Sequence, residues 1–156
     1  MIGFGFDVHR LAEGESLVLG GVTIPSPLGT VAHSDGDVIF HALVDALLGA
    51  LALGDIGEHF PDSDPRWKGA PSSVFVEHAV SLIAQHNCTI VNIDCTLVLE
   101  SPKILAVKFE MRQNIARLCS IPVERVAVKA TTSERVGFVG RSEGVQAYVI
   151  CEVQPR

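Results

Sequence analysis

Apolar and polar residues alternate strictly at the start of the chain, and this pattern predicts a β-strand over Ile2–His9. Every second residue of this strand is large and apolar. The opposite face carries Asp7 and His9, two residues apart, beside Gly3 and Gly5. Because glycine has no side chain, we expect another group to approach the backbone closely on that face.

The pattern changes to helical spacing after a short hairpin. A Gly20-Gly21 pair between two apolar triplets predicts a hairpin over Ser16–Pro25, and a further turn follows at Ser26–Gly29. Apolar residues then recur every three to four positions and predict a long helix over Gly36–Leu53. On another face of this helix, ionisable residues recur every four positions: Asp37, His41 and Asp45.

Two further helices and three strands complete the prediction. The helices are expected over Ser73–His86 and Lys103–Cys119, the second with Ser101 as N-cap and Pro102 in its first turn. The expected strands are Thr89–Glu100, whose odd-numbered residues should share one face, Val126–Ala130 and Val145–Val153. The connections Asp55–Ala70 and Thr131–Gly144 are long and polar, and such loops are usually functional or mobile.

This order of elements predicts one α+β catalytic domain over residues 1–156, with a single mixed β-sheet, helices on one of its faces and a small β-hairpin. The net charge of −6 argues against binding to nucleic acid. No apolar run reaches the roughly 20 residues of a membrane span, and no signal-peptide pattern is present. Four cysteines without C-x-x-C spacing fit a reducing compartment, so we expect a cytoplasmic protein.

Asp7 and His9 on the first strand, with His41 on the helix, form a set of two imidazoles and one carboxylate. Catalytic zinc favours such a set, because it keeps three protein ligands and one open position for a substrate oxygen. Asp45, one turn after His41, could orient the imidazole. The spacing alone fits equally well with ordinary polar residues at a strand end and on a helix.

Two other polar clusters could bind phosphate. His33-Ser34 precedes the predicted helix, whose N-terminal amides favour an anion, although Ser34 or Asp35 as a simple N-cap is the commoner explanation. In the segment Lys129–Glu134, the hydroxyls could hold phosphate oxygens, and Glu134 could bind a hard cation. An ordinary polar turn has the same composition. The chain has neither a glycine-rich phosphate loop nor a G-x-S-x-G nucleophile motif.

Five motifs occur in a fixed order and together are far more specific than any one of them. They are Gly5-Phe6-Asp7-Val8-His9; Ala32-His33-Ser34-Asp35-Gly36-Asp37 with His41-Ala42-Leu43; Leu53-Gly54-Asp55-Ile56-Gly57; Phe60-Pro61-Asp62-Ser63-Asp64-Pro65; and Lys129-Ala130-Thr131-Thr132 with Glu134. In this order the chain closely resembles the family of 2-C-methyl-D-erythritol 2,4-cyclodiphosphate synthases of the non-mevalonate isoprenoid pathway, over essentially its whole length. One departure is Glu100, where that family usually carries a neutral residue.

The resemblance implies a phosphorus–oxygen lyase. Its substrate would be 4-diphosphocytidyl-2-C-methyl-D-erythritol 2-phosphate, whose 2-phosphate attacks the β-phosphorus of the diphosphate. CMP would leave, and the cyclic diphosphate would form. No residue of the enzyme needs to act as a nucleophile, so catalysis would consist of positioning and charge neutralisation.

The resemblance also implies roles for particular residues. Asp7, His9 and His41 would bind Zn²⁺. Glu134 would bind Mg²⁺ or Mn²⁺, and His33 and Thr132 would stabilise the transition state. The other residues implied to contact the substrate are Ser34, Asp55, Gly57, Phe60, Pro61, Asp62, Ser63, Asp64, Pro102, Lys103 and Thr131. The cytidine pocket would lie at Leu99–Leu105 together with Thr131 and Thr132.

By the same resemblance, the enzyme would be a homotrimer with its sheets around a three-fold axis. Each active site would lie between two subunits. A central cavity faced by Phe138 and Arg141 could hold an isoprenoid diphosphate.

Two other functions compete with the synthase. A zinc-dependent hydrolase of a nucleotide-linked diphosphate would need a general base, for which Asp37 or Asp45 is a candidate. A trimeric binding module with a structural zinc would need a closed site of four ligands.

Overall fold

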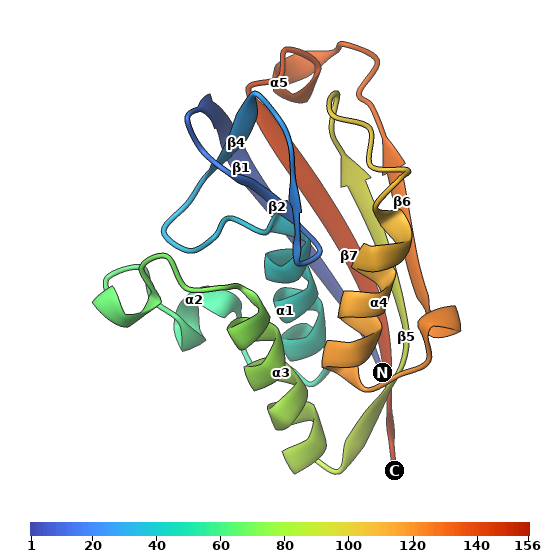
Figure 1. The fold of residues 1–156 in the computed structure, drawn as a ribbon. Coiled ribbons are helices and arrows are strands. Elements are labelled where there is room, and N and C mark those ends of the chain that lie inside the picture. The colour runs from blue at the N-terminus through green and yellow to red at the C-terminus, as the bar shows by residue number, and fades with distance from the viewer.

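The computed structural model describes residues 1–156 and arranges the strands as one five-stranded sheet and one hairpin (Figure 1). The order across the large sheet is β4-β1-β7-β5-β6. The strands are β1 (Ile2–Glu13), β4 (Leu28–Val31), β5 (Cys88–Val98), β6 (Val126–Thr131) and β7 (Gly144–Pro155). The pair of β5 and β6 is parallel and the other pairs are antiparallel, which confirms the predicted mixed sheet. The hairpin, also predicted, joins β2 (Leu17–Leu19) to β3 (Val22–Ile24).

Three long helices lie against one face of the large sheet (Figure 1). They are α1 (Val38–Ala50), α3 (Ser73–Gln85) and α4 (Lys108–Cys119). The connections contain the short helices α2 (Ile56–His59) and α5 (Gly137–Gly140) and two 3-10 turns, Pro65–Trp67 and Val123–Arg125. Helices and sheet enclose a core of 39 buried residues, as the α+β prediction requires. None of the helices combines the length and the apolar character needed to cross a membrane.

Helix α1 lies directly on the backbone of β1 because β1 carries glycine at the points of contact. A Cβ atom on Gly5 would lie 1.8 Å from the carbonyl oxygen of Ala42, and one on Gly3 would lie equally close to that of Ala46. These distances are far inside van der Waals contact, so only glycine permits the approach. The group that approaches the glycine face of the first strand is therefore a helix of the same chain. Asp7 and His9 follow further along that face.

The opposite face of β1 is apolar and uncovered. Ile2 and Phe4 are 66% and 59% exposed, and Phe6, Val8 and, on β7, Ile150 are exposed as well. These strands are neighbours in the middle of the sheet, so the residues form one continuous surface. A contiguous apolar surface of this kind marks an interaction site.

Some element boundaries differ from the prediction because distant contacts override local signals. The helix predicted from Lys103 begins at Lys108, because Ile104 turns into the core and its carbonyl accepts the N–H of Val107. The first strand continues to Glu13, where it pairs with β4. Strand β4 itself begins inside the turn predicted at Ser26–Gly29.

The alternation predicted for β5 holds only in part. A bulge between Ile90 and Asn92 shifts the register. Ile90 is buried while Thr89 and Val91 are only half-buried, so the face of odd-numbered residues is buried only from Ile93 onward. The two long connections, predicted as loops, contain α2 and α5 respectively.

Candidate metal centre and active site

Three potential ligand atoms from β1 and α1 meet at one point. Asp7 Oδ2 lies 3.0 Å from His9 Nε2 and 3.1 Å from His41 Nδ1, and the two nitrogens are 3.1 Å apart. Neighbouring ligands of a tetrahedral zinc ion lie about 3.3 Å apart, given bonds of ~2.0–2.1 Å. The structure thus brings together the three residues predicted as zinc ligands, at nearly the spacing that one ion requires.

These three side chains are largely shielded from water, with exposed fractions of 26% for Asp7, 14% for His9 and 13% for His41. Burial alone would raise the pKa of Asp7. Hydrogen bonds from His41 and His9 outweigh burial and hold that pKa far below its usual value. Asp7 is therefore a carboxylate at neutral pH, the form that binds a cation.

Asp45, expected to orient His41, has a different hydrogen-bond partner. Its Oδ1 accepts the backbone N–H of Ile56 at 2.8 Å, at the start of α2. The Nε2 atom of His41 instead faces two hydroxyls, Ser34 Oγ at 3.0 Å and Ser72 Oγ at 2.9 Å. Nothing in the sequence distinguishes Ser72 from an ordinary residue at a helix start, so sequence reasoning missed it.

Helix α1 is capped by Asp37 rather than by Ser34 or Asp35. The buried carboxylate accepts the N–H groups of Ile39 and Phe40, both at 3.1 Å, and of Gly20 and Gly21 at 3.0 and 2.7 Å. These helix amides are occupied and are not free for a phosphate. Burial raises the pKa of Asp37 to about 6, although the hydrogen bonds oppose this shift. Asp37 therefore joins the hairpin to α1 and does not line the pocket beside the triad.

The triad opens into a cavity of about 550 Å³. The residues predicted to contact the substrate that line this cavity are Asp7, His9, His33, Ser34, Gly57, Phe60, Pro61 and Asp62. Three other predicted residues of the loop do not line it. Asp55 and Asp64 cap α2 and the 3-10 turn at Pro65–Trp67, and Ser63 is exposed.

Aromatic contacts fix the loop that forms one wall of this cavity. The ring of Phe60 lies 4.5 Å from Phe75 and 5.1 Å from Trp67, measured between centroids. Phe75 on α3 also packs against His41, at 5.9 Å. His33 also lines this cavity, and its buried Nε2 atom has no hydrogen-bond partner. A buried polar atom without a partner requires an explanation, such as a bound water, an ion or a catalytic role.

A second cavity, of about 280 Å³, lies between the β5–α4 connection and the end of β6. It is lined by Leu97, Leu99, Glu100, Pro102, Lys103, Ile104, Leu105, Lys108, Ala130, Thr131 and Thr132. These include the predicted nucleotide-binding residues Pro102, Lys103, Thr131 and Thr132. Lys129 does not line it, and its ammonium pairs with Asp94 at 2.7 Å.

Glu100 organises the turn beside this second cavity. Its Oε1 atom accepts the N–H of Ser133 at 2.8 Å, the hydroxyl of Ser133 at 3.0 Å and the N–H of Arg135 at 3.3 Å. These bonds, led by that of the Ser133 amide, lower the pKa of Glu100. The turn carries Glu134, whose N–H donates to Thr132 Oγ1 at 3.2 Å. The Oε1 atom of Glu100 thus anchors this turn.

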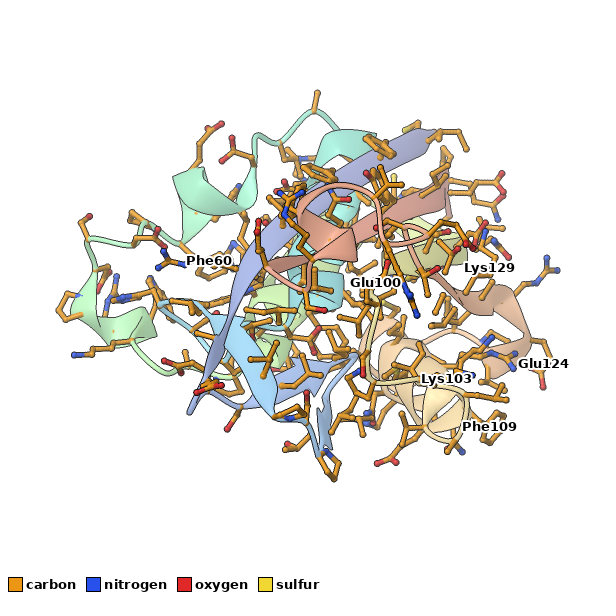
Figure 2. The ribbon with its side chains drawn as sticks, turned by 90° about the horizontal axis from the view of Figure 1, so that it is seen from above. Phe60, Glu100, Lys103, Phe109, Glu124 and Lys129 are labelled. Carbon is orange, nitrogen blue, oxygen red and sulfur yellow. The ribbon has the colours of Figure 1, made fainter.

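The two cavities have no lining residue in common. Figure 2 shows Phe60, from the first cavity, on a different side of the molecule from Lys103, from the second. Phe138 and Arg141 line neither cavity; Phe138 is exposed on α5, and the guanidinium of Arg141 pairs with Glu143 at 2.8 Å. Within one chain, the triad and the predicted nucleotide pocket are therefore separate sites.

A model of the YgbB family matches residues 1–154. The chain belongs to the YgbB family. Among proteins similar to it, the 2-C-methyl-D-erythritol 2,4-cyclodiphosphate synthase of Xylella fastidiosa is 55% identical over 96% of this chain and 85% of the relative. The protein of that name from Chlorobaculum tepidum is 50% identical over 98% of each chain.

Solved structures of YgbB-family relatives agree with this assignment. A synthase of the same name, in a form bound to CDP, superimposes with a TM-score of 0.91 at 41% identity, over 99% of this chain and 100% of the other. The family resemblance predicted from the sequence motifs is confirmed.

Proposed function

We propose that this protein catalyses the reaction of the 2-C-methyl-D-erythritol 2,4-cyclodiphosphate synthases, a lyase reaction of isoprenoid biosynthesis. The activity is that of its relatives, which are 50–55% identical across nearly the whole chain. The observation that carries the proposal is the Asp7–His9–His41 triad at the wall of a large cavity. The triad supplies cation binding where a polyanionic substrate would need it.

The reaction is an intramolecular phosphoryl transfer. The 2-phosphate of 4-diphosphocytidyl-2-C-methyl-D-erythritol 2-phosphate attacks the β-phosphorus; the bond to CMP breaks, and the cyclic diphosphate forms. His33 and Ser34 line the cavity beside the triad and would hold phosphate oxygens. The chain's task is to bring two like-charged groups of one flexible molecule together, which requires positioning and charge neutralisation.

Zn²⁺ is the ion that we assign to the triad. Two imidazole nitrogens and one carboxylate oxygen, all within hydrogen-bonding distance of one another, suit its ligand preference and leave a position open toward the cavity. When bound, zinc would neutralise and polarise a phosphate oxygen. We assign Mg²⁺ or Mn²⁺ to Glu134, an exposed residue whose backbone N–H bonds to Thr132 Oγ1.

The second cavity would receive the cytidine diphosphate portion of the substrate. A relative of the same fold has been solved in a CDP-bound form. Lys103 and Lys108 place two positive charges in the cavity wall, and Thr131 and Thr132 add hydroxyls. Charged and hydroxyl donors of this kind suit a nucleotide diphosphate.

We assign the complete active site to a homotrimer. Within one chain the two cavities are separate, and a neighbouring subunit could bring its nucleotide cavity to the triad. The uncovered apolar face of β1 and β7 would be buried around a three-fold axis. An isoprenoid diphosphate in the central cavity, near Phe138 and Arg141, belongs to the same proposal.

Product analysis tests the activity. The protein is incubated with the cytidyl-linked substrate and Mg²⁺, with and without a zinc chelator, and the products are identified by phosphorus NMR. We expect the cyclic diphosphate and CMP, and their loss with chelator. A linear monophosphate as the main product would instead indicate the hydrolase. The structure offers that alternative little support, since Asp37 and Asp45 are both held by backbone amides.

A further inference from the structure

Ser72 connects the proposed zinc ligand His41 to the half-buried carboxylate of Asp35. This residue, just before α3, is fully buried, and its Oγ lies 2.9 Å from His41 Nε2. The same hydroxyl donates to Asp35 Oδ1. The backbone N–H of Ser72 donates to the other oxygen of that carboxylate at 3.0 Å.

The hydrogen-bond roles in this chain follow from the carboxylate. An ionised carboxylate only accepts, so the hydroxyl of Ser72 must donate to Asp35. That hydroxyl then has only lone pairs to offer His41, which favours a proton on Nε2. With a cation in the triad, the Nδ1 atom of the same ring can then direct its lone pair at that ion; without one, the Asp7 carboxylate at 3.1 Å competes for a proton on Nδ1.

The position of Ser72 is not explained by helix capping. It occupies the N-cap of α3, yet its side chain makes no capping hydrogen bond. Ser34 also lies near Nε2, at 3.0 Å, but its hydroxyl contacts no carboxylate and accepts the N–H of Gly36 at 3.3 Å. Only Ser72 therefore has its hydroxyl proton committed to a carboxylate.

We propose that Ser72 and Asp35 are positioning residues that hold His41 in its Nε2–H tautomer and thereby direct Nδ1 toward the metal. This inference rests on the proposed zinc site and extends it to the residues behind the ligands. Partners of this kind fix the orientation of a ligating imidazole, and their loss typically weakens metal binding 10–100-fold.

The backbone supports this arrangement. The N–H of Asp35 donates to the carbonyl of Ala70 at 3.1 Å, and the N–H of Gly69 donates to the carbonyl of His33 at 2.7 Å. Two backbone hydrogen bonds therefore hold the segment before α3 beside the segment before α1. The hydroxyl of Ser72 is fixed in place independently of its own contact with His41.

Two measurements on metal-free and zinc-titrated protein test the proposal. Nitrogen-15 NMR of the imidazoles at pH 8 reports the tautomer of His41, and competition with a chromophoric chelator gives zinc affinity. In the metal-free wild type we expect a higher share of the Nε2–H tautomer than in Ser72→Ala, because the Asp7 carboxylate at 3.1 Å favours a proton on Nδ1 in both proteins. In Ser72→Ala we expect a mixture of tautomers and zinc affinity about 10–100-fold weaker. Ser73→Ala, one residue further on, is the matched control and should leave the tautomer of His41 and the zinc affinity unchanged.

A second pair of variants separates positioning from folding. Ser72→Thr keeps the hydroxyl, so it should show the tautomer preference of the wild type. Asp35→Asn should weaken the preference for the Nε2–H tautomer although Ser72 is still present. The proposal is overturned if folded Ser72→Ala or Asp35→Asn keeps the wild-type tautomer and binds zinc within about twofold of wild type. A wild type that binds no zinc would refute the metal assignment instead, because the tautomer is measured without metal.

Discussion

His9 Nε2 and His41 Nδ1 lie 3.1 Å apart although 32 positions separate the two residues in the chain. Their rings meet edge-on, with centroids 5.0 Å apart and an interplanar angle of 72°. Two imidazole lone pairs directed at one point repel unless a proton or a cation lies between them. With Asp7 in contact with both rings, the pair is arranged to share one positive charge.

We expect His41→Ala to lose bound zinc and nearly all turnover while remaining folded. Alanine is a good helix former, so α1 should persist while one of three ligands disappears. Metal content of the purified protein and phosphorus NMR of the products measure the two effects. His86→Ala, on the exposed end of α3, is the control and should change neither. Wild-type zinc content in His41→Ala would refute the ligand assignment.

Asp37 should make the protein less stable as the pH rises from about 4 to about 6. Its folded-state pKa of about 6 lies above the reference value of 3.8, so the folded protein retains a proton that the unfolded chain has released. The stabilisation is complete below pH 3.8 and is lost as the pH passes through 6. A pKa shift of this size corresponds to about 3 kcal/mol in the free energy of unfolding.

Comparison with Asp37→Asn isolates this effect from other titrating groups. Urea unfolding of both proteins at several pH values gives the difference in free energy of unfolding. We expect the advantage of wild type over the variant to shrink as the pH rises through that range. A difference that stays constant would show that Asp37 does not titrate there.

Glu100→Ala should weaken CDP binding without affecting zinc. The variant removes the oxygen that accepts three hydrogen bonds from Ser133 and Arg135, so the turn bearing Thr132 and Glu134 loses its anchor. Because hydrogen bonds to a charged acceptor are stronger than neutral ones, we expect a rise in Kd of roughly tenfold by calorimetry. Glu100→Gln keeps one acceptor and should lie in between.

Glu124→Ala provides the matched control for this test. Glu124 is exposed and lies away from Glu100 in Figure 2. Its replacement should leave CDP binding unchanged. Equal binding by the Glu100→Ala and Glu124→Ala variants would mean that the turn does not depend on Glu100.

Gly5→Ala should destabilise the fold by several kcal/mol, since its Cβ would lie 1.8 Å from the Ala42 carbonyl oxygen and force α1 away from β1. Gly49→Ala is the contrasting variant. Gly49 lies within α1, and the nearest atom to its added Cβ is 3.9 Å away. Alanine there should stabilise the helix by up to about 1 kcal/mol. Thermal unfolding measures both, and equal effects would contradict the close-packing explanation.

The parts of the site that the sequence reveals are those with a local signature. Asp7 and His9 appear as two polar residues on one face of an alternating strand, and His41 appears on a polar face of an amphipathic helix. The sequence motifs then identify the family. The elements that these residues occupy were predicted correctly because their hydrophobic periods are strong.

The parts of the site and fold that could not be predicted from the sequence depend on partners far along the chain. Ser72 is an ordinary serine until folding brings it beside His41 and Asp35. Asp45 looked suited to orient His41 by helical spacing, but the amide of Ile56 takes its carboxylate. The bulge after Ile90 likewise follows from pairing with β7, which local alternation does not encode.

The glycine contact between α1 and β1 has a mechanical consequence. Because the two backbones touch, the ligand atoms of His9 and His41 meet without long, flexible side chains in between. Their separation is set by the direct backbone contact between α1 and β1, whereas Gly57, Phe60 and Asp62 lie on a connection outside the sheet. The cation position thus depends on the joint between helix and sheet, and the cavity wall beside it depends on the aromatic contacts of Phe60 with Trp67 and Phe75.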